Sequence, residues 1–340
     1  MKLQPSRQSC NAHAARVSWN SPPLRTPSLL GSGTGIAASR ALHAMHKRLL
    51  TLGIAAAALA CHRPPPAASV PDAPPAAKPA PAVTPAQPVL SEYFLVTWYG
   101  NPRSSRMGVL GRHRGDELAA GLRKQAAAYA PLTAKKILPA YHLVAVIAQP
   151  HGGKDGMSRR RETRETISDM LAQARAHGFK LILDIQPGHS TVKAEIAHLR
   201  AYLEEPDVYL ALDPEFAMAP GVAPGRKIGR MTAADVNDAI DLLAAIVRDR
   251  KLPPKVLIVH QFTMNMLGEK QKIRDSPLVD VVLDVDGFGD RPLKRAMYTT
   301  IIRKPLEYPG IKLFYKEDTN LLGEADVMKL EPEPAVVIYQ

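Results

Sequence analysis

Eight short apolar runs recur between residues 91 and 340, separated by longer stretches with helical periodicity. The runs are rich in valine, isoleucine and leucine and do not alternate cleanly with polar residues, which predicts parallel strands buried on both faces. The clearest helical stretches span residues 116–130, 160–177 and 233–250, the last with Thr232 as its N-cap. The predicted strands are 94–99, 141–148, 180–185, 208–212, 255–260, 279–285, 311–315 and 335–339.

Eight alternating strands and helices predict an α/β protein with a (β/α)8 TIM barrel formed by residues 91–340. An open doubly wound sheet is disfavoured, because acidic residues follow several strands instead of clustering at one switch point. No G-x-G-x-x-G motif follows the first strand and no P-loop occurs, so nucleotide-binding folds have no support. Only Gln340 follows the eighth strand, so we expect a barrel that lacks the final helix, with helix 116–130 helping to cover the seam.

A signal for export precedes this barrel. From Met45 the chain reads MHKRLLTLGIAAAALAC, with a basic start, a short apolar run and a cysteine at position 61. Residues 45–60 resemble a bacterial lipoprotein signal peptide, after whose cleavage Cys61 would carry lipid. A plain cleaved secretory signal is the alternative, because Ala58 stands where the usual lipobox has leucine. Either signal predicts a protein exported to the cell envelope, facing the periplasm or the exterior.

The segments on either side of the signal do not read as folded domains. Residues 1–44 contain no acidic residue, and Met45 is the simplest start of translation; a disordered basic extension is the alternative. Residues 61–90 are dominated by proline and alanine, a composition that favours extended conformations and predicts a disordered tether. We therefore expect a barrel held at a membrane through lipidated Cys61, and we expect a monomer.

Most of the basic excess belongs to the leader. Seven lysines and arginines and no acidic residue precede Cys61, and without them the formal net charge falls from +12 to +5. A nucleic-acid partner is therefore not predicted. The two cysteines, Cys10 and Cys61, both lie outside the barrel, so it has no disulfide and no cysteine nucleophile or metal ligand.

Three predicted strands end in a D-x-(Q/E/D) pattern, in which two polar residues are separated by one position. Residues at i and i+2 of a strand point the same way, and the C-terminal ends of barrel strands converge on the face that carries the chemistry of such folds. We therefore expect these side chains to surround one open basin. The pairs are Asp184 with Gln186, Asp213 with Glu215, and Asp284 with Asp286.

Asp213 and Glu215 are the catalytic candidates. Two neighbouring carboxyl groups can divide the work, one staying ionised to orient or stabilise and the other keeping a raised pKa to donate a proton. Glu215, beyond the strand, suits the general acid and Asp213 its partner, as glycoside hydrolysis requires. The structural alternative is that Asp213 caps the following loop and Glu215 is solvated.

The other polar strand ends are predicted to bind the substrate. Asp284 and Asp286 could also hold a hard cation, but no EF-hand spacing occurs, so no cofactor is predicted and a divalent cation stays open. Thr97 begins T-W-Y where amidohydrolase-type barrels carry H-x-H, which disfavours that kind of metallohydrolase. The predicted polar contacts are Asp184, Gln186, His260, Gln261, Asp284, Asp286 and Glu317.

Aromatic residues are few, at 5% of the chain, yet they gather at the same strand ends. Sugar rings pack their C–H faces on aromatic rings, so acids ringed by aromatics favour a carbohydrate site; alternatively, these residues plug the barrel. The basic run 159–161 could bind an anionic polymer or form a solvated helix start. The predicted aromatic contacts are Trp98, Tyr99, Phe216, Phe262 and Tyr315.

A set of segments carries a family resemblance: TWYGNP, LPAYHLVAVIAQ, LILDIQPGHS, LALDPEF, VHQFT, VDGFG, LFYKEDTNL and the terminal VIYQ. Together they resemble a family of uncharacterised secreted bacterial lipoproteins with a glycoside-hydrolase-like barrel. This resemblance implies the fold and the envelope location and assigns no reaction. A local similarity to muramidases, whose fourth strand ends in D-x-E, matches Asp213 and Glu215 only; their acid at the end of strand one is absent here, where Tyr99 and Asn101 stand.

Three functional hypotheses follow. The first is an envelope-tethered hydrolase that cleaves glycosidic bonds of a polysaccharide or of peptidoglycan by carboxylate acid–base chemistry. The second is a non-catalytic envelope lipoprotein that binds a glycan or a protein through the barrel mouth. The third is a metal-dependent phosphoester hydrolase.

Overall fold

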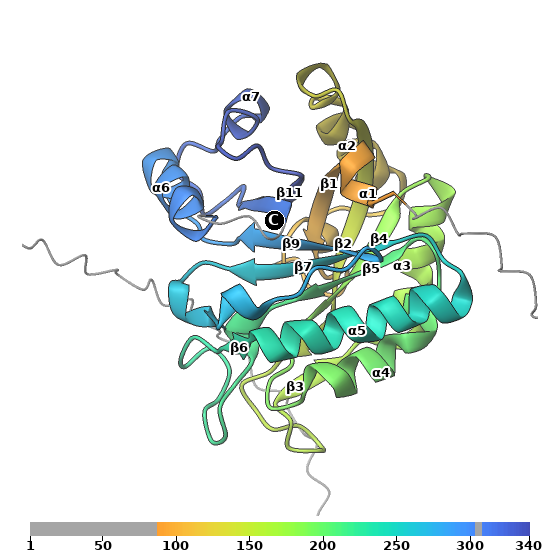
Figure 1. Cartoon of the computed structure of the whole chain (residues 1–340), viewed down its shortest axis with the longest axis vertical. Coiled ribbons are helices and arrows are strands. Elements are labelled where there is room, and N and C mark those ends of the chain that lie inside the picture. Colours follow the sequence, from red (N-terminus) through yellow and green to blue (C-terminus); the bar gives the residue numbers. More distant parts are fainter. Residues whose placement is uncertain (1–86, 303–307) are drawn as a thin grey trace, which may run out of the picture. The chain divides into compact units, whose positions relative to one another are not determined.

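The computed structural model describes residues 87–302 and 308–340 (Figure 1). The predicted extension 1–44, the signal 45–60, Cys61 and nearly all of the tether lie outside these residues. Helix α1 (Val89–Glu92) includes the last two residues assigned to the tether, and Leu90 is fully buried. Within the described ranges, no helix has the length and apolar character needed to cross a bilayer.

Eight parallel strands close into a barrel, which confirms the predicted TIM-barrel fold. These strands are β1 (Tyr93–Gly100), β2 (Lys136–Ala148), β4 (Lys180–Ile185), β5 (Val208–Leu212), β7 (Lys255–Gln261), β9 (Val279–Val285), β10 (Tyr308–Leu313) and β11 (Val336–Tyr339). They pair in this order, and β11 pairs with β1 to complete the ring. Outside the barrel, β3 (Arg159–Arg161) runs antiparallel to β2, and β6 (Met231–Thr232) pairs with β8 (Leu267–Gly268).

Helices follow most of the barrel strands and pack on the outside. They are α2 (Gly115–Ala127), α3 (Arg164–Ala176), α4 (Val192–Leu203), α5 (Ala233–Arg250), α6 (Arg291–Ile301) and α7 (Glu324–Val327). Between β7 and β9 stand only β8 and the 3-10 turns η4 (Met264–Met266) and η5 (Lys270–Lys272). Figure 1 shows α4 and α5 side by side.

Side-chain caps determine where two of these helices begin. Helix α5 starts where predicted, and Thr232 and Asp235 form a reciprocal capping box there. Helix α3 starts at Arg164, later than the predicted position 160, because residues 159–161 pair with β2 and Thr163 then accepts the N–H of Thr166.

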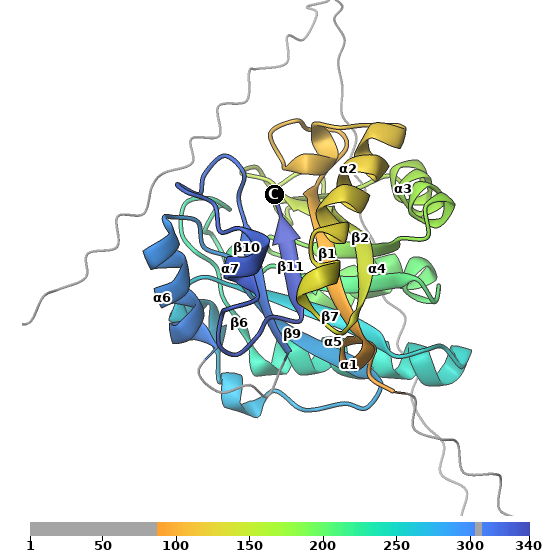
Figure 2. The ribbon, with the colours of Figure 1, turned by 90° about the horizontal axis from the view of Figure 1, so that it is seen from above.

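No helix follows β11 in the described part of the chain, and α2 contributes to the cover of that seam. Tyr129, just beyond α2, is buried, and its hydroxyl lies 2.7 Å from that of Tyr339 on β11. The Tyr129 ring also lies 5.0 Å from that of Phe94 on β1. Figure 2 shows β11 beside β1. The expected covering role of segment 116–130 agrees with these contacts.

Strand alternation divides the core into two layers. On β1, Phe94, Val96 and Trp98 belong to the outer layer that packs against the helices, whereas Leu95 and Tyr99 belong to the inner layer. Near the N-terminal end of the barrel the inner layer is apolar except for Asp280, and it changes to polar side chains toward the C-terminal end. The candidate site lies among these polar side chains.

Candidate functional site

Carboxylates from different strands meet at His260 inside the barrel. The Nδ1 atom of His260, on β7, lies 2.8 Å from Oδ2 of Asp284 and 3.5 Å from Oδ2 of Asp286, both carried by β9 and the residue after it. Its Nε2 atom lies 3.7 Å from Oδ2 of Asp184 on β4. His260, Asp184 and Asp284 are fully buried. The parallel barrel thus brings three of the predicted acids to one histidine.

The pair Asp213 and Glu215 lies at the next strand end and joins this group through Gln186. The amide Nε2 of Gln186 donates to Oδ2 of Asp213 over 3.2 Å and lies 3.5 Å from the Tyr99 hydroxyl. Asp213 Oδ1 accepts the backbone N–H of Glu215 at 3.1 Å and so caps the 3-10 turn η3 (Pro214–Phe216). The capping role considered for Asp213 is therefore present, and it also fixes the backbone of Glu215.

A buried lysine supplies positive charge at the same place. Lys312, on β10, points its Nζ atom at Oδ2 of Asp286 over 3.3 Å and lies 3.6 Å from the centre of the Tyr99 ring. Behind it, Lys294 donates to the carbonyl oxygens of Lys312 and Gly287 and lies 3.2 Å from Asp318. The buried ion pair of Lys294 and Asp318 thus fixes the backbone of Lys312, and β10 directs the Lys312 ammonium group at the acids.

The carboxyl groups hold protons more strongly than usual. Burial, with the charges of Asp184 and Glu215, raises the pKa of Asp213 well above its ordinary value. Burial is also the main cause that raises the pKa of Asp184. Glu215, partly buried and close to the Asp286 charge, has its pKa raised to about 7. A proton on Glu215 near neutral pH suits a general acid.

The cationic groups respond to the same neighbours. Burial opposes the charge of His260, but the hydrogen bond to Asp284 and the charge of Asp184 outweigh it and raise the pKa to about 9. Burial likewise opposes the charge of Lys312, and the surrounding aspartates raise its pKa nonetheless. For His142, burial and the charges of His260 and Lys312 lower the pKa well below its ordinary value, so this imidazole is neutral.

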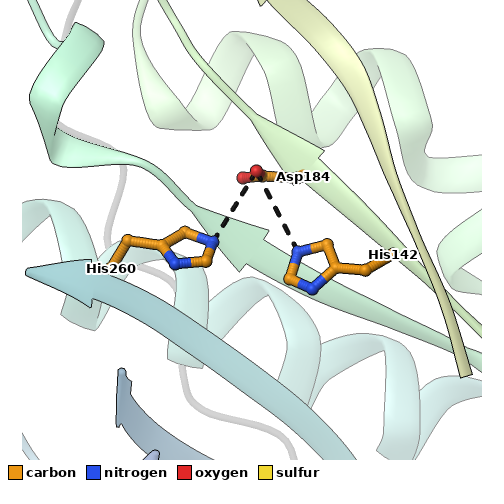
Figure 3. A group of neighbouring side chains, drawn as sticks. All are labelled: His142, Asp184 and His260. Atoms are coloured by element: carbon orange, nitrogen blue, oxygen red, sulfur yellow. Dashed lines mark ion pairs between the residues drawn. The ribbon is translucent and has the colours of Figure 1, made fainter. Parts of the chain in front are cut away.

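Several buried polar atoms near the centre have no hydrogen-bond partner among the described residues. They include both ring nitrogens of His142, both carboxylate oxygens of Asp184, Nε2 of His260 and Oδ1 of Asp284. Figure 3 shows the imidazoles of His142 and His260 on either side of the Asp184 carboxylate, with His142 Nε2 4.0 Å from Oδ2. Two groups here could hold a metal ion, namely His142 with Asp184 and His260, and His260 with Asp284 and Asp286.

Two residues predicted as aromatic contacts do not lie with the acid cluster. Trp98 faces outward, because the inward position on β1 belongs to Tyr99; its ring packs against α2, where a Cβ on Gly121 would lie 2.2 Å from it. Tyr315 stacks on Tyr339 with ring centres 5.2 Å apart and donates to Gln125 on α2. Both rings therefore lie on the α2 side of the sheet, away from the acids.

The remaining predicted contacts are not brought to the cluster by any described hydrogen bond or ion pair. Gln261 is buried, but its amide donates to the carbonyl of Thr263 in its own loop. Glu317 is exposed in the turn after β10. Phe216 and Phe262 are partly buried beside the loops that follow β5 and β7.

The basic run 159–161 has a structural role. Arg159 and Arg161 both bind the buried carboxylate of Glu195 on α4, at 2.9 and 2.7 Å. Arg160 lies 2.8 Å from Glu162. The run therefore joins β3 to α4 and does not offer three free cations to an anionic polymer.

Sequence reasoning missed His142 and Lys312. Both lie within apolar runs, where a titratable residue is easily assigned to the core. Such a residue on a strand with both faces covered is itself a signal, because charged groups are seldom fully buried without partners. On β2 and β10 that signal marks an inward side chain at the level of the acids.

Two cavities lie near this end of the barrel, and neither is lined by the acid cluster. One, of about 340 Å³, lies between the loops that follow β4 and β5 and is bordered by Gly188, Met218 and Ile228. The other, of about 150 Å³, lies between α2 and α3. Within the cluster, Glu215 is only partly buried and the Asp286 side chain is 9% exposed. These two carboxyls are therefore the most exposed members of the cluster.

Comparisons with known proteins give distant structural similarities only. The sequence matches no protein-family model and no curated protein. Similar solved structures include an oxaloacetate acetylhydrolase in complex with the product oxalate, at 14% identity over 73% of this chain and 75% of that one, with a TM-score of 0.42. A ruminal GH26 endo-β-1,4-mannanase shares 7% identity over 74% of this chain and 59% of that one, with a TM-score of 0.36. A GH18 chitinase from Pseudoalteromonas aurantia shares 11% identity over 72% and 79%, with a TM-score of 0.28.

Proposed function

We propose that this protein is a hydrolase that cleaves a glycosidic bond by carboxylate acid–base chemistry, with Glu215 as the proton donor. The observation that carries the proposal is the meeting of Asp184, Asp213, Glu215 and Asp286 at one barrel end, where few cations face them. So many buried carboxyls cannot all ionise together, so the group retains protons near neutral pH. A retained proton at a barrel mouth is what protonation of a leaving oxygen requires.

Each residue has a distinct role in this proposal. Glu215 is placed where the cluster meets solvent, and Asp213 holds its backbone N–H. Asp286, paired with Lys312 at 3.3 Å, is the partner carboxylate that stabilises positive charge on the sugar or activates water. Gln186 links Asp213 to Tyr99 and keeps the inner acids in place.

A second candidate is a non-catalytic envelope protein that binds a glycan or a protein through the barrel mouth. The burial of Asp184, Asp213 and Asp284 favours it, because a cleavage site must admit the bond that it cleaves. This candidate predicts saturable binding without products.

The same proposal extends to the cell envelope. A leader ending at Cys61 and a proline-rich tether would hold the barrel at a membrane, where polysaccharide or peptidoglycan is within reach. Palmitate labelling of wild type and Cys61→Ser would test the anchor: lipid incorporated by wild type and lost in the variant supports it, and no incorporation contradicts it.

The reaction is tested by incubating the barrel segment with peptidoglycan and a panel of glycans and measuring released reducing ends. Wild type should release product, and Glu215→Gln should lose about 10²–10⁴-fold in rate. Asp280→Asn, which removes a buried carboxyl at the other end of the barrel, is the matched control and should keep activity. Turnover that survives in Glu215→Gln would contradict the assigned acid, and binding without release would favour the second candidate.

A further inference from the structure

We propose that the barrel interior binds one divalent first-row transition-metal ion through His142 Nε2, Asp184 Oδ2 and His260 Nε2. The proposed acid–base chemistry at Glu215 needs no metal, so this site goes beyond it. The three residues come from β2, β4 and β7 and are all fully buried. Figure 3 shows their polar ends directed at one another.

The spacing of the three atoms suits a single ion. His142 Nε2 lies 4.0 Å and His260 Nε2 lies 3.7 Å from Asp184 Oδ2, and all three ligand atoms lie within 4.8 Å of one another. Ligands at ~2.1 Å from a tetrahedral ion are separated by ~3.4 Å. To reach that spacing the two imidazole-to-carboxylate distances would shorten by about 0.3 and 0.6 Å, and the separation of the two imidazole nitrogens by up to about 1.4 Å.

Unsatisfied polar atoms supply the independent observation. His142 Nε2, Asp184 Oδ2 and His260 Nε2 have no hydrogen-bond partner among the described residues, although each is buried. A buried polar atom without a partner is costly, and here three such atoms converge. One bound cation satisfies all three together.

A neighbouring carboxylate orients one of the ligands. His260 Nδ1 lies 2.8 Å from Asp284 Oδ2. A metal ion that displaces the Nε2 proton would leave the Nδ1 N–H donating to that carboxylate, with Nε2 facing Asp184 as the ligand atom. A carboxylate bonded to the far nitrogen of a ligating histidine is the usual support of a metal ligand. Asp284 therefore supports the proposed ligand His260 from the side of the ring that faces away from the metal.

The alternative group of His260, Asp284 and Asp286 is less suitable. His260 Nδ1 is already bonded to Asp284, and Asp286 is paired with the ammonium group of Lys312 at 3.3 Å, which repels a cation there. Two imidazoles and one carboxylate also suit Zn²⁺ or Fe²⁺ better than Ca²⁺ or Mg²⁺, which prefer oxygen ligands. Three protein ligands leave a further position open, as catalytic metal sites do.

Metal binding is tested directly on the purified full-length chain. The protein is stripped with chelator, titrated with Co²⁺ and with Zn²⁺, and then analysed for bound metal by mass spectrometry. We expect one equivalent of bound ion and the visible absorption of a tetrahedral Co²⁺ complex. His142→Gln should abolish that absorption, and Asp284→Asn should weaken binding about 10–100-fold.

Asp280→Asn is the matched control, because it changes a buried carboxyl on the same strand as Asp284 at the opposite end of the barrel. It should bind Co²⁺ as wild type does. Circular dichroism separates lost binding from lost folding in every variant. A folded wild type that binds neither Co²⁺ nor Zn²⁺ would overturn the site, as would unchanged binding in folded His142→Gln.

Discussion

Two buried lysines near opposite ends of the barrel show how differently the molecule surrounds the same side chain. Lys255, the first residue of β7, donates to the carbonyl oxygens of Glu205 and Val208 at 2.7 and 2.8 Å, and burial lowers its pKa to about 8. Lys312, at the C-terminal end of β10, faces Asp286 at 3.3 Å, and the surrounding aspartates overcome burial and raise its pKa. The surroundings of Lys255 therefore disfavour its positive charge, whereas the aspartates around Lys312 stabilise its positive charge.

The carboxyl groups repeat this difference. Asp280, at the N-terminal end of β9, accepts the backbone N–H of Leu90 at 2.7 Å and stands alone among apolar inner residues. Asp284, four residues along the same strand, shares His260 with two other acids. A lone buried acid with a backbone donor needs no functional explanation, whereas a group with unpaired atoms and excess negative charge does.

Removing the positive charge of Lys312, at the C-terminal end of the barrel, should have the largest effect on stability. Lys312→Met leaves Asp286 and its neighbours without their ammonium group, so the free energy of unfolding should fall by about 3–5 kcal/mol at pH 7. The loss should shrink at lower pH, because the carboxyls then gain protons. Urea unfolding of the variant and wild type at pH 5 and pH 7 measures both effects.

The control for this change is Lys255→Met. It removes a charge that burial already disfavours, so we expect a cost of about 1–2 kcal/mol from the two carbonyls that lose their donor. Equal losses for the two lysine variants would contradict the distinction between the two ends.

Truncation of a buried side chain at the N-terminal end of the barrel should have the next largest effect. Leu90 is fully buried in the inner layer beside the barrel's N-terminal end, and Leu90→Ala should reduce the free energy of unfolding by about 2–4 kcal/mol. The activity of the folded variant should not change, because Leu90 is far along the barrel from Glu215. Thermal unfolding and the glycan assay test the two statements separately, and a specific loss of activity in folded protein would contradict them.

The fold was largely predictable because buried parallel strands appear in the sequence as short runs of valine, isoleucine and leucine. The strands at 180–185, 208–212 and 279–285 begin and end where predicted. The acids at these strand ends were also visible. The aromatic contacts were harder, because neighbouring residues of one strand face opposite layers, and the sequence does not say whether Trp98 or Tyr99 points inward. His142 and Lys312 were missed because an isolated polar residue in an apolar run gives no indication of its partners.

A smaller effect is expected from Glu215→Gln when stability is measured against pH. The folded protein holds the Glu215 proton up to a pKa of about 7, above the ordinary value of 4.5. The folded state thus binds a proton that the unfolded state releases, so this residue makes wild-type stability fall as pH rises from about 4.5 to about 7. Glutamine mimics the protonated acid and avoids that fall.

Glu215→Gln should therefore be no more stable than wild type at pH 4.5 and more stable than wild type at pH 8. Urea unfolding of both proteins at several pH values gives the difference. A stability difference that does not change over this range would show that Glu215 is solvated and its pKa ordinary, as the structural alternative proposed.

The smallest effect should come from Asp280→Asn at the N-terminal end of the barrel. Burial raises the pKa of Asp280, so its neutral form is already favoured, and asparagine keeps an oxygen that can accept the Leu90 N–H. The free energy of unfolding should change by no more than about 1 kcal/mol at pH 7. Asp284→Asn, on the same strand, should cost more because it removes the charged partner of His260. If Asp280→Asn instead lowered the free energy of unfolding as much as Asp284→Asn, a buried charge would matter equally at both ends of the barrel. The interpretation of the acidic cluster as a functional site would then lose its support.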